Sequence, residues 1–125
     1  MKTAISIPGA PKPVAPYSQA IADQGFVFVS GQGAVDPVTN LYQPGDIRAE
    51  TARTLENLKI ILQAAGSSLE KVTKVNVYLR DIRDFPGMNE VYARYFTAPY
   101  PARTTIQAGA LPNGIAVEID CTARQ

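Results

Sequence analysis

Two charged side chains in the C-terminal quarter of this sequence, Arg103 and Glu118, have the chemistry of a reactive site. Each lies in a stretch with the two-residue alternation of a β-strand, which predicts strands at 102–108 and 115–123. If the apolar residues of both strands pack under helices, then Arg103, Thr105 and Glu118 share the opposite face of the sheet. The alternation therefore predicts a polar cluster on one sheet face.

Two interpretations of this pair follow from its chemistry. Removing an arginine and a glutamate from water is costly unless the charges are paired, and a buried salt bridge between Arg103 and Glu118 would account for both. Alternatively, the planar guanidinium binds the carboxylate of a small substrate, while Glu118 holds or activates a water molecule. Spacing alone leaves both interpretations open.

The composition excludes several other kinds of site. The sequence has no histidine, which removes the commonest general base and most zinc sites. Its single cysteine, Cys121, permits no internal disulfide and lies in an apolar alternation typical of a buried structural thiol. The formal net charge is +1, so polyanion binding is not indicated. We expect a site that needs neither a metal nor a cofactor.

The organisation of the chain is simple. No repeat, low-complexity tract or linker divides it, so residues 1–125 are treated as one domain. The first residues lack the long apolar core of a secretion signal, and no segment approaches membrane-spanning length. These features predict a soluble, cytoplasmic protein.

The remaining patterns predict an α+β fold. Helices are expected at 47–65 and from residue 85 or 88 to 96, the first with Asp46 as its N-cap and Gly66 just after its end. Further strands are predicted at 3–7, 18–22, 26–30 and 72–81. Two helices cover only one face of such a mixed sheet.

The uncovered face must be protected in another way. The segment Phe26–Val29 is apolar on both faces, which a strand exposed to water on one side should not be. In a chain of this length, the simplest cover is another copy of the same chain. We therefore predict a homo-oligomer.

Four further residues are candidate ligand contacts by type. Tyr17 follows a proline-rich segment and would close a pocket; Ser30 and Gly31 end a strand with small residues that suit backbone approach to a ligand; Asn89 begins the second helix. Each has a structural alternative: packing for Tyr17, a plain strand end for Ser30 and Gly31, and a helix cap for Asn89.

Several motifs resemble one protein family. Pro101-Ala102-Arg103-Thr104-Thr105-Ile106, followed by Leu111-Pro112 and Val117-Glu118-Ile119, is similar to the C-terminal signature of the RidA/YjgF family of reactive-intermediate deaminases. Further landmarks occur in the family's order: Ala15-Pro16-Tyr17-Ser18-Gln19-Ala20, Phe28-Val29-Ser30-Gly31-Gln32, Thr54-Leu55-Glu56-Asn57-Leu58, and Asp84-Phe85 with Asn89-Glu90-Val91-Tyr92. The resemblance covers essentially the whole chain.

The resemblance implies a fold, an assembly and a reaction. The fold would be a chorismate-mutase-like α+β domain that forms a homotrimer with the sheets inside and active sites between subunits. Members of the deaminating branch hydrolyse 2-imino acids, such as 2-iminobutanoate and 2-iminopropanoate, to 2-oxo acids and ammonia.

The resemblance also implies residue roles. Arg103 would bind the substrate carboxylate and Glu118 would hold the hydrolytic water. Tyr17 and Ser30 would line the pocket, Gly31 and Thr105 would contribute backbone groups, and Asn89 would lie near the cleft. Well-studied bacterial members carry cysteine where this chain has Thr105, so a mechanism or a regulation that uses a thiol there is excluded.

Other functions are known within the same fold, so membership alone leaves alternatives open. Some members are described as endoribonucleases or translation inhibitors, which the near-zero charge and the lack of histidine oppose. A non-catalytic ligand-binding or chaperone-like trimer would need Arg103 but not Glu118. A different substrate, such as an aminoacrylate or an aminomuconate-type compound, is a further alternative.

Overall fold

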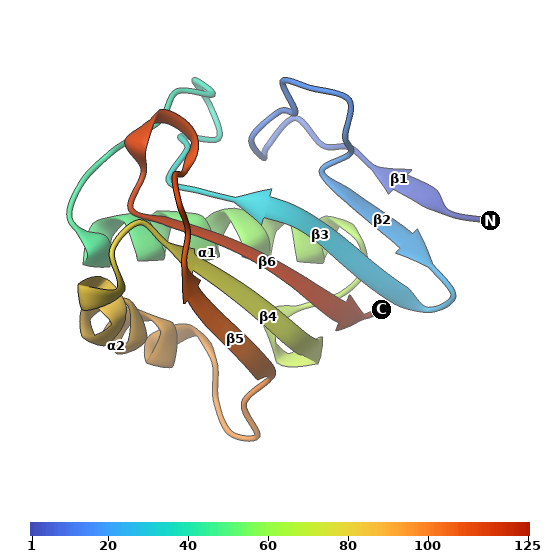
Figure 1. Cartoon of the computed structure of the whole chain (residues 1–125). Helices are drawn as coiled ribbons and strands as arrows, with labels where there is room; N and C mark the ends of the chain where they lie inside the picture. The colour runs from blue at the N-terminus through green and yellow to red at the C-terminus, as the bar shows by residue number, and fades with distance from the viewer.

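Alternating apolar residues build one mixed sheet, which the computed structural model describes together with two helices over residues 1–125 (Figure 1). The strands lie in the order β1-β2-β3-β6-β4-β5, and β4 and β5 form the parallel pair. Their ends lie within two residues of the predicted positions: β1 Thr3–Ile5, β2 Ala20–Asp23, β3 Phe26–Gln32, β4 Val72–Leu79, β5 Ala102–Gln107 and β6 Val117–Arg124. The predicted α+β fold is confirmed.

Two long helices, α1 (Ile47–Ala64) and α2 (Phe85–Tyr95), lie side by side against one face of the sheet (Figure 1). The predicted cap of α1 is confirmed, because the Asp46 carboxylate accepts a hydrogen bond from the Ala49 amide at 2.9 Å. Gly66 follows the helix with φ of +79°, a left-handed conformation that favours glycine. Neither helix combines the length and apolarity that a membrane span requires.

Three short 3₁₀ turns, Leu69–Lys71, Ile82–Asp84 and Pro112–Gly114, complete the connections. Helix α2 joins the parallel strands β4 and β5, as a crossover between parallel strands requires. The C-terminal strand β6 is inserted between β3 and β4 and pairs antiparallel with both. Residues from the last strand therefore lie at the centre of the sheet.

The core lies between the sheet and the helices. Its side chains include Val27, Val75 and Ile119 from the sheet and Leu55 and Leu58 from α1, all essentially inaccessible to water. Burial of such aliphatic side chains supplies the main stabilisation of the fold.

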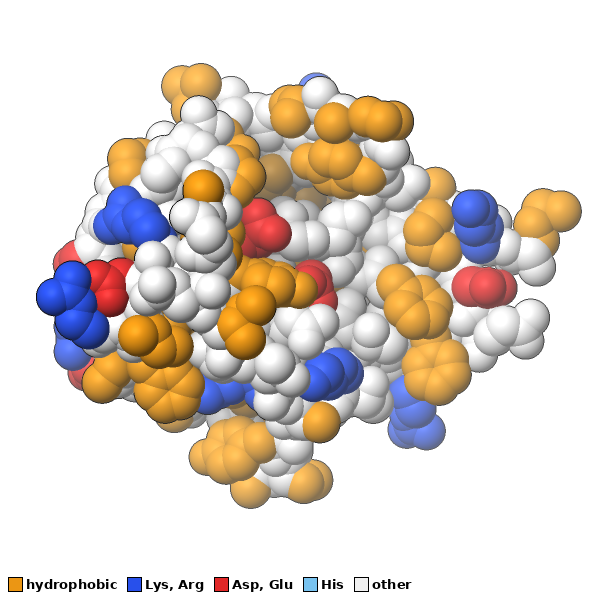
Figure 2. Space-filling model, viewed as in Figure 1, with side chains coloured by type: hydrophobic (Ala, Val, Ile, Leu, Met, Phe, Trp, Pro, Cys, Tyr) orange, Lys and Arg blue, Asp and Glu red, His pale blue; other side chains and the backbone are white.

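The other face of the sheet is open. Phe26, Phe28 and Ile106 retain 41%, 47% and 47% of their surface exposed on it, while Val27 and Val29 face the helices. Figure 2 views this open face and shows apolar side chains over β3 and around a central hollow. The apolar character of β3 on both faces is thus confirmed, and a protein surface of this kind is typical of an interaction site.

Candidate active site

Glu118 lies on the open face, near the start of β6. It pairs with Tyr78 of β4, and its carboxylate crosses over Gly31 so closely that a Cβ at position 31 would lie 2.6 Å from Oε2. The side chain is half-buried, and this burial, with a smaller contribution from the negative charge of Asp120, raises the pKa of the Glu118 carboxyl. A carboxyl of raised pKa in a hollow is suited to general acid–base chemistry.

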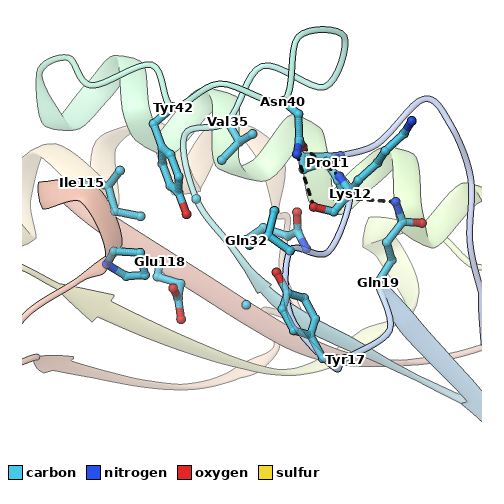
Figure 3. A pocket seen from close by; sticks show the side chains of 14 residues that line it. Pro11, Lys12, Tyr17, Gln19, Gln32, Val35, Asn40, Tyr42, Ile115 and Glu118 are labelled. Carbon is cyan, nitrogen blue, oxygen red and sulfur yellow. Dashed lines mark hydrogen bonds between the residues drawn. The ribbon is translucent and has the colours of Figure 1, made fainter.

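A cavity of about 120 Å³ opens beside this carboxylate (Figure 3). Tyr17, Tyr42 and Ile115 line it together with Glu118 and the exposed backbone of Gly31. In Figure 3 the Tyr17 and Tyr42 rings lie on different sides of the space that the Glu118 carboxylate borders. The cavity therefore combines tyrosine and aliphatic side chains with a few polar groups, among them the oppositely charged Glu118 and Lys12, as small-ligand sites usually do.

The cavity forms where β3 and β6 stop pairing regularly. Their register shifts between Val29 and Gln32, so that Ser30 and Gly31 lie in an irregular segment of the ladder. The Ser30 hydroxyl donates a hydrogen bond to the Ser18 carbonyl at 2.6 Å, and the Ser30 amide donates to the Gln19 carbonyl at 3.0 Å. Ser30 thus holds the Tyr17–Gln19 segment against the cavity.

Gln19 fixes the proline-rich wall of the same cavity. Its buried side chain accepts a hydrogen bond from the Ile7 amide at 2.8 Å and donates to the carbonyls of Ile7 at 3.1 Å and Pro11 at 3.0 Å. Prolines lack an amide donor and cannot join the sheet, so this side chain replaces strand pairing there. No role for Gln19 was predicted from the sequence, although a polar residue at the start of a buried strand was the available signal.

Arg103 occupies a second region, on the helix side of β5. Its guanidinium carbon lies 4.6 Å from the ring centre of Tyr92 and 5.6 Å from that of Phe85, both on α2. Such stacking stabilises a guanidinium without using its N–H groups. The three ion pairs of the chain join Arg48 to Glu90, Arg83 to Asp81 and Arg94 to Glu90, so Arg103 has no carboxylate partner.

Asn89 and Thr105 lie near Arg103. Asn89 and Arg103 border one open hollow, together with Tyr92, Tyr100 and Pro101. Asn89 lies inside α2, so the alternative that it caps this helix is wrong. The hydroxyls of Thr105 and Tyr92 are buried without a hydrogen-bond partner, which is uncommon for buried polar groups.

The prediction that Arg103, Thr105 and Glu118 share a sheet face is wrong. In the parallel β4–β5 ladder, Arg103 lies beside Val75 and Thr105 beside Val77, and both valines are buried under the helices. The aromatic rings of α2 provide a favourable surface for the guanidinium there, while Ile106 lies on the open face. The salt bridge between Arg103 and Glu118 is accordingly not formed within one chain.

The seven predicted residues therefore fall into two groups. Tyr17, Ser30, Gly31 and Glu118 surround or support the cavity at the β3–β6 junction. Arg103, Asn89 and Thr105 lie near the helix α2 and the edge strand β5. Each chain holds two partial sites rather than one complete constellation.

Comparisons with known proteins identify the family to which this chain belongs. A family model described as Endoribonuclease L-PSP, which represents the RidA/YjgF family, matches residues 8–125. The chain belongs to the RidA/YjgF family. The resemblance inferred from the sequence motifs is thereby confirmed.

Individual relatives match over nearly the full length. A RutC family protein of Pyrococcus horikoshii is 49% identical over 98% of both chains. A 2-iminobutanoate/2-iminopropanoate deaminase of Dermatophagoides farinae is 40% identical, over 95% of this chain and 93% of its own. The crystal structure of a putative endoribonuclease of Thermotoga maritima, 42% identical, superposes with a TM-score of 0.96 over 100% of this chain and 98% of its own.

The contact between Gly31 and Glu118 generates a prediction. In Gly31→Ala the new methyl group would overlap Oε2, so we expect the flexible Glu118 side chain to swing toward water and its carboxyl pKa to fall toward the ordinary value. A carboxyl-carbon NMR titration of Glu118 would measure this shift. Gly9→Ala, where a Cβ would meet no atom within 4 Å, is the matched control. An unchanged Glu118 titration in Gly31→Ala would contradict the arrangement.

Proposed function

We propose that this RidA/YjgF protein hydrolyses reactive 2-imino acids, such as 2-iminobutanoate and 2-iminopropanoate, to 2-oxo acids and ammonia. The observation that supports this most strongly is Arg103, whose guanidinium is stacked on Tyr92 and has no carboxylate partner in the chain. An arginine held in this way can bind a small carboxylate through two parallel hydrogen bonds. The relative of Dermatophagoides farinae that is named as such a deaminase agrees with this substrate class.

The proposed reaction assigns one role to each charged residue. Arg103 binds the substrate carboxylate, and Glu118 orients a water molecule toward the iminium carbon. As the water oxygen forms its bond to that carbon, its proton passes to Glu118. The carboxyl then returns the proton to the amino nitrogen. The C–N bond breaks as the hydroxyl oxygen forms the carbonyl, and the hydroxyl proton passes through Glu118 to the departing ammonia, which leaves the 2-oxo acid and ammonium. The raised pKa of Glu118 suits a group that both takes and gives a proton.

This chemistry places modest demands on the protein. The iminium carbon is already electrophilic, so orientation of water and management of its proton supply the needed acceleration without a metal or a cofactor. Lowering the barrier by about 4 kcal/mol would accelerate hydrolysis roughly a thousandfold.

We propose the same secondary roles that the family resemblance implies. Tyr17 and Ser30 line or support the substrate cavity, with Ser30 acting through its bond to Ser18. Gly31 and Thr105 offer backbone groups, and Asn89 lies beside the carboxylate end of the substrate. Tyr92 is added to this set because its ring orients the Arg103 guanidinium.

A complete site would require two copies of the chain. Arg103 and Glu118 lie on opposite faces of the sheet, and Phe26, Phe28 and Ile106 leave the open face apolar. We propose a homotrimer, the assembly implied by the family resemblance, in which the open face of each copy is covered and Arg103 of one copy meets Glu118 of another. Isologous or cyclic packing of identical chains is the common way to cover such a face.

An endoribonuclease function is less well supported, although the family description and two structural relatives, of Thermotoga maritima and Entamoeba histolytica, carry that name. The candidate cavity is lined by one acidic and one basic side chain, Glu118 and Lys12, and so lacks the cluster of positive charges that binds a polyanion. The net charge of +1 offers little electrostatic attraction for RNA.

A coupled assay tests the proposed reaction directly. Threonine dehydratase would generate the imine from threonine, and the appearance of 2-oxobutanoate would be followed with and without this protein. We expect faster release with the wild-type chain. Arg103→Lys keeps the charge but loses the planar fork, so we expect KM to rise. Glu118→Gln should lower kcat by roughly 10²-fold because the proton acceptor is lost.

Two outcomes of the same assay would contradict the proposal. Release no faster than spontaneous hydrolysis with the wild-type chain would exclude the deaminase proposal. Full activity of Glu118→Gln would instead indicate that Glu118 plays no part in the reaction.

The pKa of Glu118 predicts a pH dependence. Because burial favours the neutral carboxyl, this group becomes protonated on acidification at a higher pH than an ordinary glutamate, whose pKa is about 4.3. As general base, Glu118 must be ionised to accept the proton of water, so kcat/KM should fall as the pH drops through this raised pKa. The pH profile of kcat/KM, measured with preformed imine, checks this. An acid limb at or below the ordinary value would contradict it.

A further inference from the structure

A glutamate on α1 is buried in the protein although it takes no part in an ion pair. Glu50 is only 2% exposed, and its two carboxylate oxygens accept hydrogen bonds from separate backbone amides. Oε1 accepts from Ala116 at 2.8 Å, and Oε2 accepts from Gly45 at 3.2 Å. Burial of a carboxylate is costly unless such bonds compensate it, so this side chain is held in one position.

A second polar side chain projects from the same face of the helix, two turns further on. Asn57 is fully buried, and its Nδ2 donates hydrogen bonds to the carbonyls of Gly33 at 3.2 Å and Val35 at 2.8 Å. Its Oδ1 accepts from Arg53 at 3.1 Å, which fixes the orientation of the amide. Residues seven apart on a helix lie on one face, so Glu50 and Asn57 form a polar stripe directed at the sheet.

Apart from the Gly45 amide, the backbone groups that this stripe binds belong to the two segments that form the walls of the Glu118 cavity. Gly33 and Val35 follow the end of β3, and Ala116 precedes β6. These segments lie where β3 and β6 separate, and there the Ala116 amide and the Val35 carbonyl have no main-chain partner, whereas the Gly33 carbonyl also accepts a hydrogen bond from the Val35 amide at 2.9 Å. The α1 side chains provide the missing partners at the point where the sheet opens into the cavity.

We propose that Glu50 and Asn57 are positioning residues that set the distance between the two cavity walls and thereby place the Glu118 carboxylate over Gly31. This inference rests on the proposed function for its kinetic consequence. We call the hydrogen bonds of Glu50 to Ala116 and of Asn57 to Gly33 and Val35 the two braces. Glu118 is two residues from Ala116, and Gly31 is two residues from Gly33, so each brace lies close in sequence to one of the two residues of the Gly31–Glu118 contact.

A further contact connects the two walls directly. A Cβ at position 33 would lie 2.5 Å from Cδ1 of Ile115, so the Ile115 side chain fills the space over Gly33. A shift of either wall would therefore move the other. Both walls would lose their fixed separation if one brace were removed.

Kinetics of four variants test the proposal. Glu50→Ala and Asn57→Ala remove one brace each. In Glu50→Gln the amide oxygen can still accept from the Ala116 amide, but the side-chain NH2 group then faces the Gly45 amide, so two donors oppose each other. Thr51→Val is the matched control, because Thr51 is fully buried on the same helix and its hydroxyl bonds only to the Ile47 carbonyl at 2.7 Å. Each variant would be compared by kcat, KM and Tm, at a temperature where all are folded.

We expect kcat for 2-iminobutanoate hydrolysis to fall by about 10- to 100-fold in Glu50→Ala and Asn57→Ala, because misplacing a reacting group by about 1 Å has such consequences. The KM should change by less than about threefold, since carboxylate binding depends on Arg103 on another element. The kcat of Glu50→Gln should lie between those of the wild-type chain and Glu50→Ala. Thr51→Val should keep the wild-type kcat even if its Tm falls as far as the Tm of Glu50→Ala or Asn57→Ala.

Equal kcat values in the brace variants and in Thr51→Val would overturn the proposal. If Glu50→Ala does not fold, then Glu50→Gln and Asn57→Ala decide by the same comparison. If the wild-type chain itself has no deaminase activity, the proposed function fails separately, and amide hydrogen exchange decides the inference. Faster exchange at Val35 and Ala116 in the respective brace variants, but not in Thr51→Val, would support it; unchanged exchange would overturn it.

Discussion

The separation of β3 from β6 creates buried backbone groups that a continuous sheet would have paired, and the candidate site depends on how these groups are satisfied. An unpaired buried amide or carbonyl costs about 1–3 kcal/mol, so the opening persists only with substitute partners. Glu50 and Asn57 of α1 supply them at Ala116 and Val35, while Ser30 and Gln19 bond the N-terminal segment that borders the same cavity. The same bonds that satisfy the backbone hold the walls around Glu118.

A second constraint separates the charges of the site. The edge strand β5 turns Arg103 toward α2, where the Tyr92 and Phe85 rings stabilise the guanidinium without neutralising it. Glu118 lies on the opposite face, where half-burial raises its pKa. Keeping the two apart prevents an ion pair within one chain, as the proposed separate roles of Arg103 and Glu118 require.

The sequence predicted the fold well because its signals are local. The Asp46 cap, the Gly66 terminus and the two-residue alternation in β4 and β6 each depend on neighbouring residues, and all are confirmed. The face of β5 was wrongly predicted because Thr104 and Thr105 do not differ in polarity, and an edge strand has only one neighbour to enforce its orientation. Packing against α2, which no local pattern encodes, decides that face.

The site could be predicted only in part for the same reason. Strand alternation, residue type and the family motifs together pointed to Tyr17, Ser30, Gly31 and Glu118, which the structure brings to one cavity or its supports. Glu50 and Asn57 were missed, although their spacing with Thr54 and Ile61 places them on the buried stripe of α1. A glutamate in the first turn of a helix also interacts favourably with the helix dipole. This common explanation accounts for Glu50 without any contact to the cavity walls, so the pattern alone did not indicate that contact.

The central claim is that one site combines Arg103 of one copy with Glu118 of another, and mixing inactive variants tests it most directly. Arg103→Ala and Glu118→Gln would be assayed alone and after unfolding and refolding together in equal amounts. If neighbouring copies share each site in a closed ring, random mixing restores one intact site in about four, so we predict about a quarter of the wild-type rate. No recovery above the separate variants, with mixed assembly verified by mass spectrometry, would contradict the account.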